Sequence, residues 1–268
     1  MPIQHVALSI AGFDGSGGAG IQADLKAFSA LGCYGMTVLT ALPVQNTCGV
    51  KSCYEIPVQA VTGQLQTLFE DIRPHSIKIG MLYSEEIITA VADFLKQHAQ
   101  GIPVVLDPVA VAKSGAPLLL PEAVNALKTT MLPLATLVTP NLPEAQTLTG
   151  KAIKSAGEMP EVAALLQAMG AKNVLIKGGH LNEGNARDLL LNQEGELQWF
   201  TGPRIQSKNT HGTGCTLSAA IAANLARGLE LADACADAKQ YLSLAIESAS
   251  QQSVGKGHGP VHHFFQWW

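Results

Sequence analysis

Residues 5–31 read HVALSIAGFDGSGGAGIQADLKAFSAL. An apolar run of strand length, residues 5–10, leads into the glycine-rich segment 12–20 and then into a helical pattern over residues 20–31. The order predicts a strand, a tight loop and a helix, which is the unit that α/β proteins repeat.

The same alternation continues along the rest of the chain. Further strands are expected at residues 36–44, 76–82, 103–106, 136–138 and 173–176. Further helices are expected at residues 57–70, 84–98, 121–131, 143–149, 158–169, 213–226 and 231–250. Strands that are apolar throughout are typical of a parallel sheet covered on both faces. The pattern therefore predicts one α/β domain, residues 1–268, with a doubly wound sheet. A β-hairpin formed by residues 186–191 and 196–200 is expected before the last two helices.

Composition narrows the classes of partner. The chain has 268 residues, of which 47% are hydrophobic and 14% charged, and its net charge is −4. A weakly acidic chain without a Lys or Arg cluster offers nothing to nucleic acid or to an anionic membrane, so we expect neither partner. We expect no signal peptide and no membrane span, hence a cytoplasmic protein. Five cysteines without a CxxC or Cys/His spacing favour neither a disulfide framework nor a zinc site.

The first glycine-rich segment fits two interpretations. Gly15, Gly17 and Gly20 match the GxGxxG pattern of dinucleotide sites. Such sites need an acidic residue at the end of the second strand, but residues 36–46 contain none. The alternative is a tight turn that only lets strand and helix pack closely.

The second glycine-rich segment is NTHGTGCT, residues 209–216, which leads into a helix of small residues. Two glycines at a helix start let consecutive backbone N–H groups converge on one anion, and the helix dipole adds to the attraction. The segment therefore suits a phosphoryl group in transfer. The alternative is that Thr213 is an ordinary helix cap and Cys215 a buried apolar residue.

The two glycine-rich segments belong to a series of stretches that resembles a known family along nearly the whole chain. The matching stretches, in chain order, are AGFDGSGGAGIQADLK, QNT, KIGML, LDPV followed by AKSG, TPNLPEA, KGGH, NTHGTGCTLSAAIA, AKQYL and GHGPVHHF. They are similar to the hydroxymethylpyrimidine and hydroxymethylpyrimidine-phosphate kinases of thiamine biosynthesis, in the ribokinase superfamily. The resemblance implies a three-layer α/β/α sandwich without a separate lid domain, commonly a homodimer. It also implies that Mg²⁺ and ATP serve to phosphorylate 4-amino-5-hydroxymethyl-2-methylpyrimidine and then its monophosphate.

The same resemblance implies the residues that bind the pyrimidine. They are Gly12, Gly20, Asp24, Gln45, Met81 and Val109. Gln45 is the main specificity candidate, because a carboxamide donates and accepts at once, as an aminopyrimidine edge requires. The alternatives are a loop glutamine bonded to backbone, a solvated Asp24 in the first helical turn, and Met81 as core filler.

For the nucleotide and the metal, the resemblance implies a second set of residues. Asn141, Lys177 and, more weakly, Lys239 are placed near ATP, and Glu144 and Asp107 near Mg²⁺. Asn141 and Glu144 also fit a capping box without any metal, and Asp107 could cap a turn. Either lysine could instead lie on the surface. His180 and His211 receive no catalytic role.

Cys215 stands where many sugar kinases of the superfamily carry an aspartate base, after Gly212, Thr213 and Gly214. A helix N-terminus lowers the pKa of a thiol from about 8.5, so we expect Cys215 to be partly thiolate and to act as base or hydrogen-bond partner for the hydroxymethyl group. A titratable thiol would also tolerate the second acceptor, which is an ionised phosphate. Replacement of Cys215 by alanine should then slow phosphorylation of the alcohol more than that of the monophosphate.

Some segments depart from the family pattern or lack an assigned role. Phe13, Gly15, Pro43 and Ala110 are unusual for the family and could alter the pocket. Residues 110–117 are expected to form a mobile flap. The aromatic tail 264–268 is expected to dock on the domain or at a subunit interface. Two alternatives in function remain: a pyridoxal or pyridoxine kinase, and a non-catalytic ligand-binding domain on the same fold.

Overall fold

The computed structural model describes residues 4–109, 119–120, 122–181 and 184–268. Its main sheet has eight strands in the order β10-β9-β8-β7-β6-β5-β1-β2. Strands β2, β1, β5, β6, β7 and β8 are mutually parallel, and β9 and β10 continue the sheet antiparallel. Their bounds are β1 (Val6–Ala11), β2 (Tyr34–Leu39), β5 (Ser76–Ile79), β6 (Val104–Leu106), β7 (Leu137–Val138), β8 (Asn173–Lys177), β9 (Ala186–Leu191) and β10 (Leu197–Gly202).

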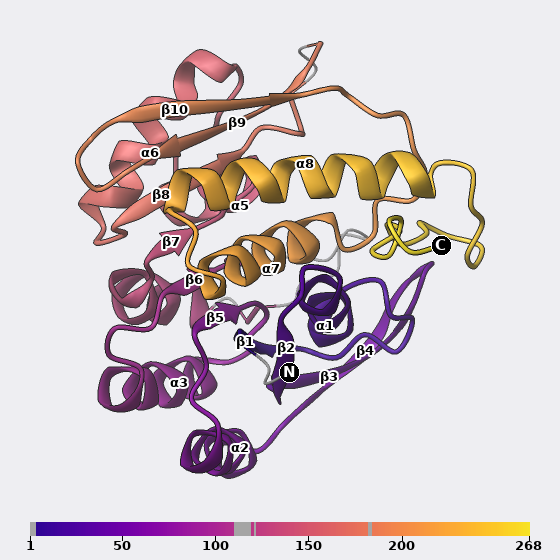
Figure 1. The fold of residues 1–268 in the computed structure, drawn as a ribbon. Helices are drawn as coiled ribbons and strands as arrows, with labels where there is room; N and C mark the ends of the chain where they lie inside the picture. Colours follow the sequence, from indigo (N-terminus) through magenta and orange to yellow (C-terminus); the bar gives the residue numbers. More distant parts are fainter. Residues whose placement is uncertain (1–3, 110–118, 121, 182–183) are drawn as a thin grey trace.

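Helices cover both faces of this sheet (Figure 1). One face carries α1 (Gly20–Ala30), α7 (Thr213–Ala226) and α8 (Leu231–Ala249). The other carries α2 (Val58–Asp71), α3 (Glu85–His98), α4 (Ala123–Ala126), a π-helical turn (Leu127–Met131), α5 (Leu142–Thr149) and α6 (Met159–Ala168). The doubly wound, three-layer architecture expected from the sequence is thereby confirmed.

Each central strand presents different residues to the two faces. In β1, Leu8 and Ile10 pack into the core under α2 and α3, whereas Ala7 packs against α1 and α7. In β5, Ile77 and Ile79 join the first core, while the hydroxyl of Ser76 donates to the carbonyl of Ala222 in α7 at 2.6 Å. Side chains alternate along a strand, so the small and polar residues all reach the α1 and α7 side. This side is where the functional groups described below begin.

The expected strand 36–44 was wrong in part. The chain leaves the main sheet at Thr40, whose N–H donates to the carbonyl of Ala11 and whose hydroxyl donates to that of Met81. It continues as β3 (Ala41–Asn46), which pairs antiparallel with β4 (Gly49–Glu55) in a separate two-stranded ribbon. Strand β4 gave no apolar signal because most of its side chains are exposed.

The expected flap, residues 110–117, lies outside the described residues, as does Ala110. The C-terminal aromatic tail docks on the domain through Phe265, whose ring lies 5.6 Å from that of Tyr241 in α8. Within the described residues, no helix combines the length and the apolar character that crossing a membrane requires.

Candidate active site

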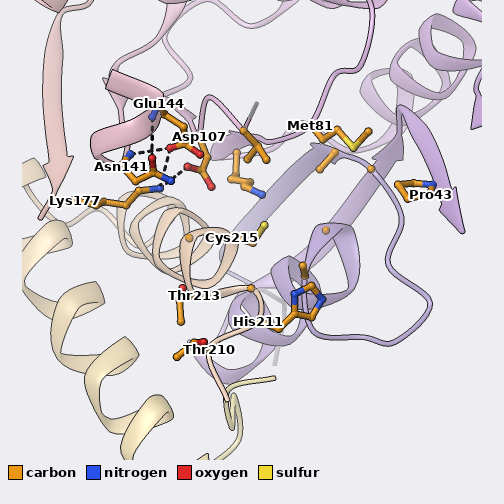
Figure 2. Close-up of a pocket in the computed structure, with 18 of the residues that line it drawn as sticks. Pro43, Met81, Asp107, Asn141, Glu144, Lys177, Thr210, His211, Thr213 and Cys215 are labelled. Atoms are coloured by element: carbon orange, nitrogen blue, oxygen red, sulfur yellow. Dashed lines mark hydrogen bonds and ion pairs between the residues drawn. The ribbon is translucent and has the colours of Figure 1, made fainter. Parts of the chain in front are cut away.

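A cavity of about 430 Å³ lies at the carboxyl ends of the parallel strands. Ligands of open α/β sheets bind at this edge. Most residues singled out in the sequence line it together: Gly12, Gly20, Gln45, Met81, Asp107, Val109, Asn141, Glu144, Lys177, Gly212, Thr213, Gly214 and Cys215. Phe13 and Pro43, two departures from the family pattern, line it as well. In Figure 2 the carboxylates and Lys177 gather at one end, Met81 and Pro43 lie at the other, and Cys215 lies between them.

The turn before α7 aims backbone N–H groups into this cavity. Gly212 has a φ of 77°, a left-handed conformation that favours glycine. A Cβ on Gly212 would also overlap the carbonyl oxygen of Gly18, so the two glycine-rich segments touch here. The N–H groups of Thr213, Gly214 and Cys215 begin the helix and have no acceptor within it. N–H groups placed in this way, together with the helix dipole, can bind an anion.

Buried charges occupy the end of the cavity near α5. The Nζ of Lys177 lies 2.7 Å from Oδ1 of Asp107 and 3.8 Å from Oε2 of Glu144. Asp107 also accepts from the hydroxyls of Thr139 and Ser218. Burial raises the pKa of the Glu144 carboxyl to about 7, and Asp107 adds to the rise while Lys177 opposes it. One buried lysine thus holds two neighbouring carboxylates.

Asn141 and Glu144 form the capping box that the sequence also allowed. The side chain of Asn141 accepts from the N–H of Glu144 at 2.9 Å, and the carboxylate of Glu144 accepts from the N–H of Asn141 at 2.7 Å. Because both residues line the cavity as well, the cap fixes the Glu144 carboxylate at the cavity wall. The structural and functional interpretations of this motif are compatible.

Gln45 and Met81 lie at the other end, on the ribbon and after β5. The Nε2 of Gln45 donates to the carbonyl of Phe13 at 3.0 Å, which fixes the carboxamide beside the first glycine-rich segment. Gly20, at a φ of 57°, has its Cα so close to Gly12 that a Cβ would overlap the Gly12 carbonyl oxygen. The first segment is therefore a tight turn, and it also forms one wall of the cavity.

The expected thiolate at Cys215 is contradicted. Burial raises the pKa of the Cys215 thiol to about 11, and the positive charge of Lys78 and the N–H of Gly20 oppose the rise only in part. The helix N-terminus predicts the opposite direction, but desolvation of a thiolate in this enclosed position outweighs it. Cys215 is a neutral thiol at neutral pH.

Two residues assigned to the site do not line the cavity. Asp24 is fully buried beneath it, where its carboxylate binds the Nζ of Lys78 at 2.8 and 3.0 Å. Lys239 in α8 binds the carboxylate of Asp188 in β9 at 2.6 Å. Neither is a solvated surface charge, so the surface alternative is wrong for both residues, and their assignment to the site stays a prediction.

Sequence reasoning missed the contact that joins the two glycine-rich segments. Nε2 of His211 lies 2.8 Å from Oδ2 of Asp14, which is fully buried. Asp14 also accepts from the N–H groups of Gly18 and Ala19 and from the hydroxyl of Ser16. Burial raises the pKa of Asp14, but the hydrogen bonds from His211 and Ser16, with the His211 charge, lower it to about 2. Asp14 therefore stabilises the fold as a carboxylate.

Replacement of Asp14 by asparagine should lower the free energy of unfolding by about 2 kcal/mol at pH 7. Because the folded pKa lies below the unfolded value, this contribution is complete above pH of about 4 and declines as the pH falls towards 2. Urea denaturation of both proteins should show about half of the difference remaining at pH 3. Asp93→Asn, an exposed carboxylate, is the control. A difference that stays constant from pH 7 to pH 3 would contradict the assignment.

A helix N-terminus that faces buried lysines and carboxylates at the edge of a doubly wound sheet can bind the phosphates of a nucleotide and stabilise the charge of a group in transfer. Fold and site together define a kinase of the ribokinase-like class.

Comparisons with known proteins agree with this class and narrow it. The sequence model of the family described as phosphomethylpyrimidine kinase matches residues 14–262. The chain is 52% identical to a hydroxymethylpyrimidine/phosphomethylpyrimidine kinase of Salmonella typhimurium, over 98% of both chains. The chain belongs to the phosphomethylpyrimidine kinase family.

Solved structures give the same fold. A phosphomethylpyrimidine kinase from Clostridium difficile superposes with a TM-score of 0.80 at 42% identity, over 90% of this chain and 99% of that one. A Bacillus subtilis pyridoxal kinase in complex with ADP superposes with a TM-score of 0.88 at 37% identity, over 98% of both chains.

Proposed function

We propose that this protein uses ATP to phosphorylate 4-amino-5-hydroxymethyl-2-methylpyrimidine and then its monophosphate, within thiamine biosynthesis. The observation that carries the proposal is that one cavity is lined by both Gln45 and the first N–H groups of α7. Gln45 suits the aminopyrimidine edge, and the N–H groups suit the phosphoryl group that is transferred.

The residues divide the reaction between the two ends of the cavity. Gln45, Met81 and Val109 orient the ring, so that its hydroxymethyl group lies next to Cys215. The N–H groups of residues 212–215 hold the γ-phosphoryl group while its charge spreads over three oxygens. Lys177 neutralises the nucleotide phosphates, and Asn141 lies within the same wall.

The donor set fits a magnesium ion. Asp107 and Glu144 offer two buried carboxylates, and the pKa of Glu144 is raised by burial and by Asp107, a repulsion that a cation relieves. Mg²⁺ takes one or two carboxylates together with waters and substrate phosphates. Bound there, the ion would neutralise the ATP phosphates. Among the described residues, no group of three His, Cys, Asp or Glu side chains suits a metal held by the protein alone.

Steady-state kinetics with three acceptors test the proposal. We expect kcat/KM for the hydroxymethylpyrimidine and its monophosphate to exceed that for pyridoxal by at least tenfold. The pyridine ring of pyridoxal leaves hydrogen-bonding groups of the Gln45 carboxamide without a partner. A preference for pyridoxal would favour the pyridoxal kinase alternative. Absence of ATP turnover with all three would leave only a ligand-binding domain.

Cys215→Ala should slow phosphorylation of the alcohol at least tenfold and that of the monophosphate less than threefold, because only the alcohol must lose a proton. With a thiol pKa of about 11, the thiolate fraction rises about tenfold for each pH unit between pH 7 and pH 10. The wild-type rate with the alcohol should follow that rise, and the variant should not.

The exposed Cys48 supplies the matched control, Cys48→Ala, which should leave both rates unchanged. Equal losses on the two acceptors in Cys215→Ala would show that the thiol only shapes the pocket.

A further inference from the structure

Lys78 is a buried cation of the cavity that the mechanism above does not use. It lies in β5, its side chain is 0% exposed, and it nevertheless lines the cavity with Cys215. Its neighbours in the strand, Ile77 and Ile79, belong to the apolar core on the other face. A lysine in such a strand needs a buried partner to remain charged.

Asp24 is that partner, and it fixes the ammonium in place. Both carboxylate oxygens of Asp24 accept from Nζ of Lys78, at 3.0 and 2.8 Å, and the hydroxyl of Ser9 donates to the same carboxylate at 2.5 Å. A Cβ on Gly80 would come within 2.8 Å of Nζ, so the glycine leaves the space that the ammonium occupies.

The ion pair has a direction with respect to the cavity. Lys78 lines the cavity and Asp24 does not, so the positive end of the pair faces the cavity. An ammonium has three N–H donors, and the bonds to Asp24 use two of them. Burial lowers the pKa of Lys78, but the carboxylates of Asp24 and Asp107 raise it above its usual value, so the residue keeps its proton.

Lys78 differs from the other lysine of the cavity in where its ion-pair partner lies. Among the described lining residues, the Lys and Arg side chains are Lys78 and Lys177. Lys177 is engaged by Asp107 and Glu144, which themselves line the cavity. The partner of Lys78, by contrast, lies outside the cavity, so the ammonium is the group of this ion pair that faces the cavity.

We propose that Lys78 is a specificity-determining residue that receives the negative charge of the phosphorylated acceptor, and that Asp24 is the positioning residue that holds it. The proposal rests on the proposed function. In the second reaction a phosphate oxygen of the acceptor bonds to the γ-phosphorus, the bond to the bridging oxygen of ATP breaks, and that oxygen leaves with the electron pair on ADP. The ionised acceptor loses no proton, but two anions must approach each other, and a fixed cation offsets their repulsion.

Kinetics of a pair of variants test the role. Lys78→Met leaves Asp24 buried without its cation, so the double variant Lys78→Met with Asp24→Asn removes both charges and avoids that defect. We expect the double variant to lose at least thirtyfold in kcat/KM for the monophosphate, chiefly through KM, and less than threefold for the alcohol. A purely structural role predicts that the double variant restores both activities or loses both equally, and either result would overturn the proposal.

A second measurement reports the local charge without any turnover. Iodoacetamide is neutral and iodoacetate is anionic, and both alkylate the same thiolate, so the ratio of their rates at Cys215 does not depend on its pKa. The groups that act on this thiol are Lys78 of β5, Asp24 of α1, Asp107 after β6 and Lys177 of β8. Cys48, exposed on the ribbon, provides the internal reference ratio in the same protein.

We expect the iodoacetate-to-iodoacetamide ratio at Cys215, divided by that at Cys48, to fall at least fivefold in the double variant. An unchanged ratio would refute a positive charge directed at the acceptor, whatever the kinetics show. A lower ratio in a protein that phosphorylates no pyrimidine would instead refute the proposed function and keep Lys78 as an anion-binding residue.

Discussion

Gly212→Ala should abolish most of the kinase activity, with kcat lowered by about 10²-fold or more. The φ of 77° at Gly212 is strained for alanine, and the added Cβ overlaps the carbonyl oxygen of Gly18. The turn must therefore move, and the first N–H groups of α7 no longer point towards the same position in the cavity. Because these donors act on charge that develops in the transition state, kcat should fall more than KM rises.

Gly228→Ala is the matched control. Gly228 follows α7 with a φ of 85°, and a Cβ there would meet no atom within 4 Å. Both variants should lose about 1 kcal/mol of unfolding free energy from the left-handed backbone. Gly212→Ala should lose more, because of the overlap with Gly18, and only Gly212→Ala should lose activity. Urea denaturation and steady-state turnover of the two proteins make the comparison. If Gly212→Ala kept the kcat of the wild-type protein, the turn before α7 would have no role in phosphoryl transfer.

Asp107→Asn should have the second largest effect, lowering kcat by about 10²-fold and the free energy of unfolding by about 3 kcal/mol. The carboxylate is 1% exposed and lies 2.7 Å from Nζ of Lys177. Its neutralisation leaves the lysine with Glu144 alone and withdraws one of the two carboxylates expected to hold Mg²⁺. Unfolding and turnover are measured on the same preparations.

The double variant Asp107→Asn with Lys177→Met separates these two effects. Removing both charges should recover part of the lost stability, since no buried charge is left without a partner. It should recover no activity, because the phosphates then lack the lysine as well. Recovery of turnover in the double variant would contradict a role of the pair in phosphoryl transfer.

The order of strands and helices was predictable because each element of the main sheet carries its own local signal. The continuous apolar runs gave the parallel strands, and α7 begins and ends at the expected residues. The ribbon was not predictable in this way. Its second strand, β4, is mostly exposed, and the break at Thr40 depends on acceptors in Ala11 and Met81 that only the folded chain brings near.

The site was predictable where a short motif carries it and not where distant residues pair. Gly212 to Cys215, Asn141 and Glu144 lie within motifs, and the structure gathers them around one cavity. The pairs Asp24 with Lys78 and Asp14 with His211 join residues 54 and 197 positions apart. The thiol of Cys215 was misjudged for the same reason, since burial is a property of the whole fold. The roles of these residues and the homodimer stay predictions.

The alternation of β1 and β5 separates two kinds of mutation within the same strands. Leu8, Ile10, Ile77 and Ile79 belong to the apolar core on one face, where a conservative exchange should alter chiefly the stability. Ser9 and Lys78 point to the opposite layer, where they belong to the chain of polar contacts beneath the cavity. With the role proposed for Lys78, a substitution inside the sheet would change which acceptor is preferred, although the adjacent residues of the same strand affect only the core.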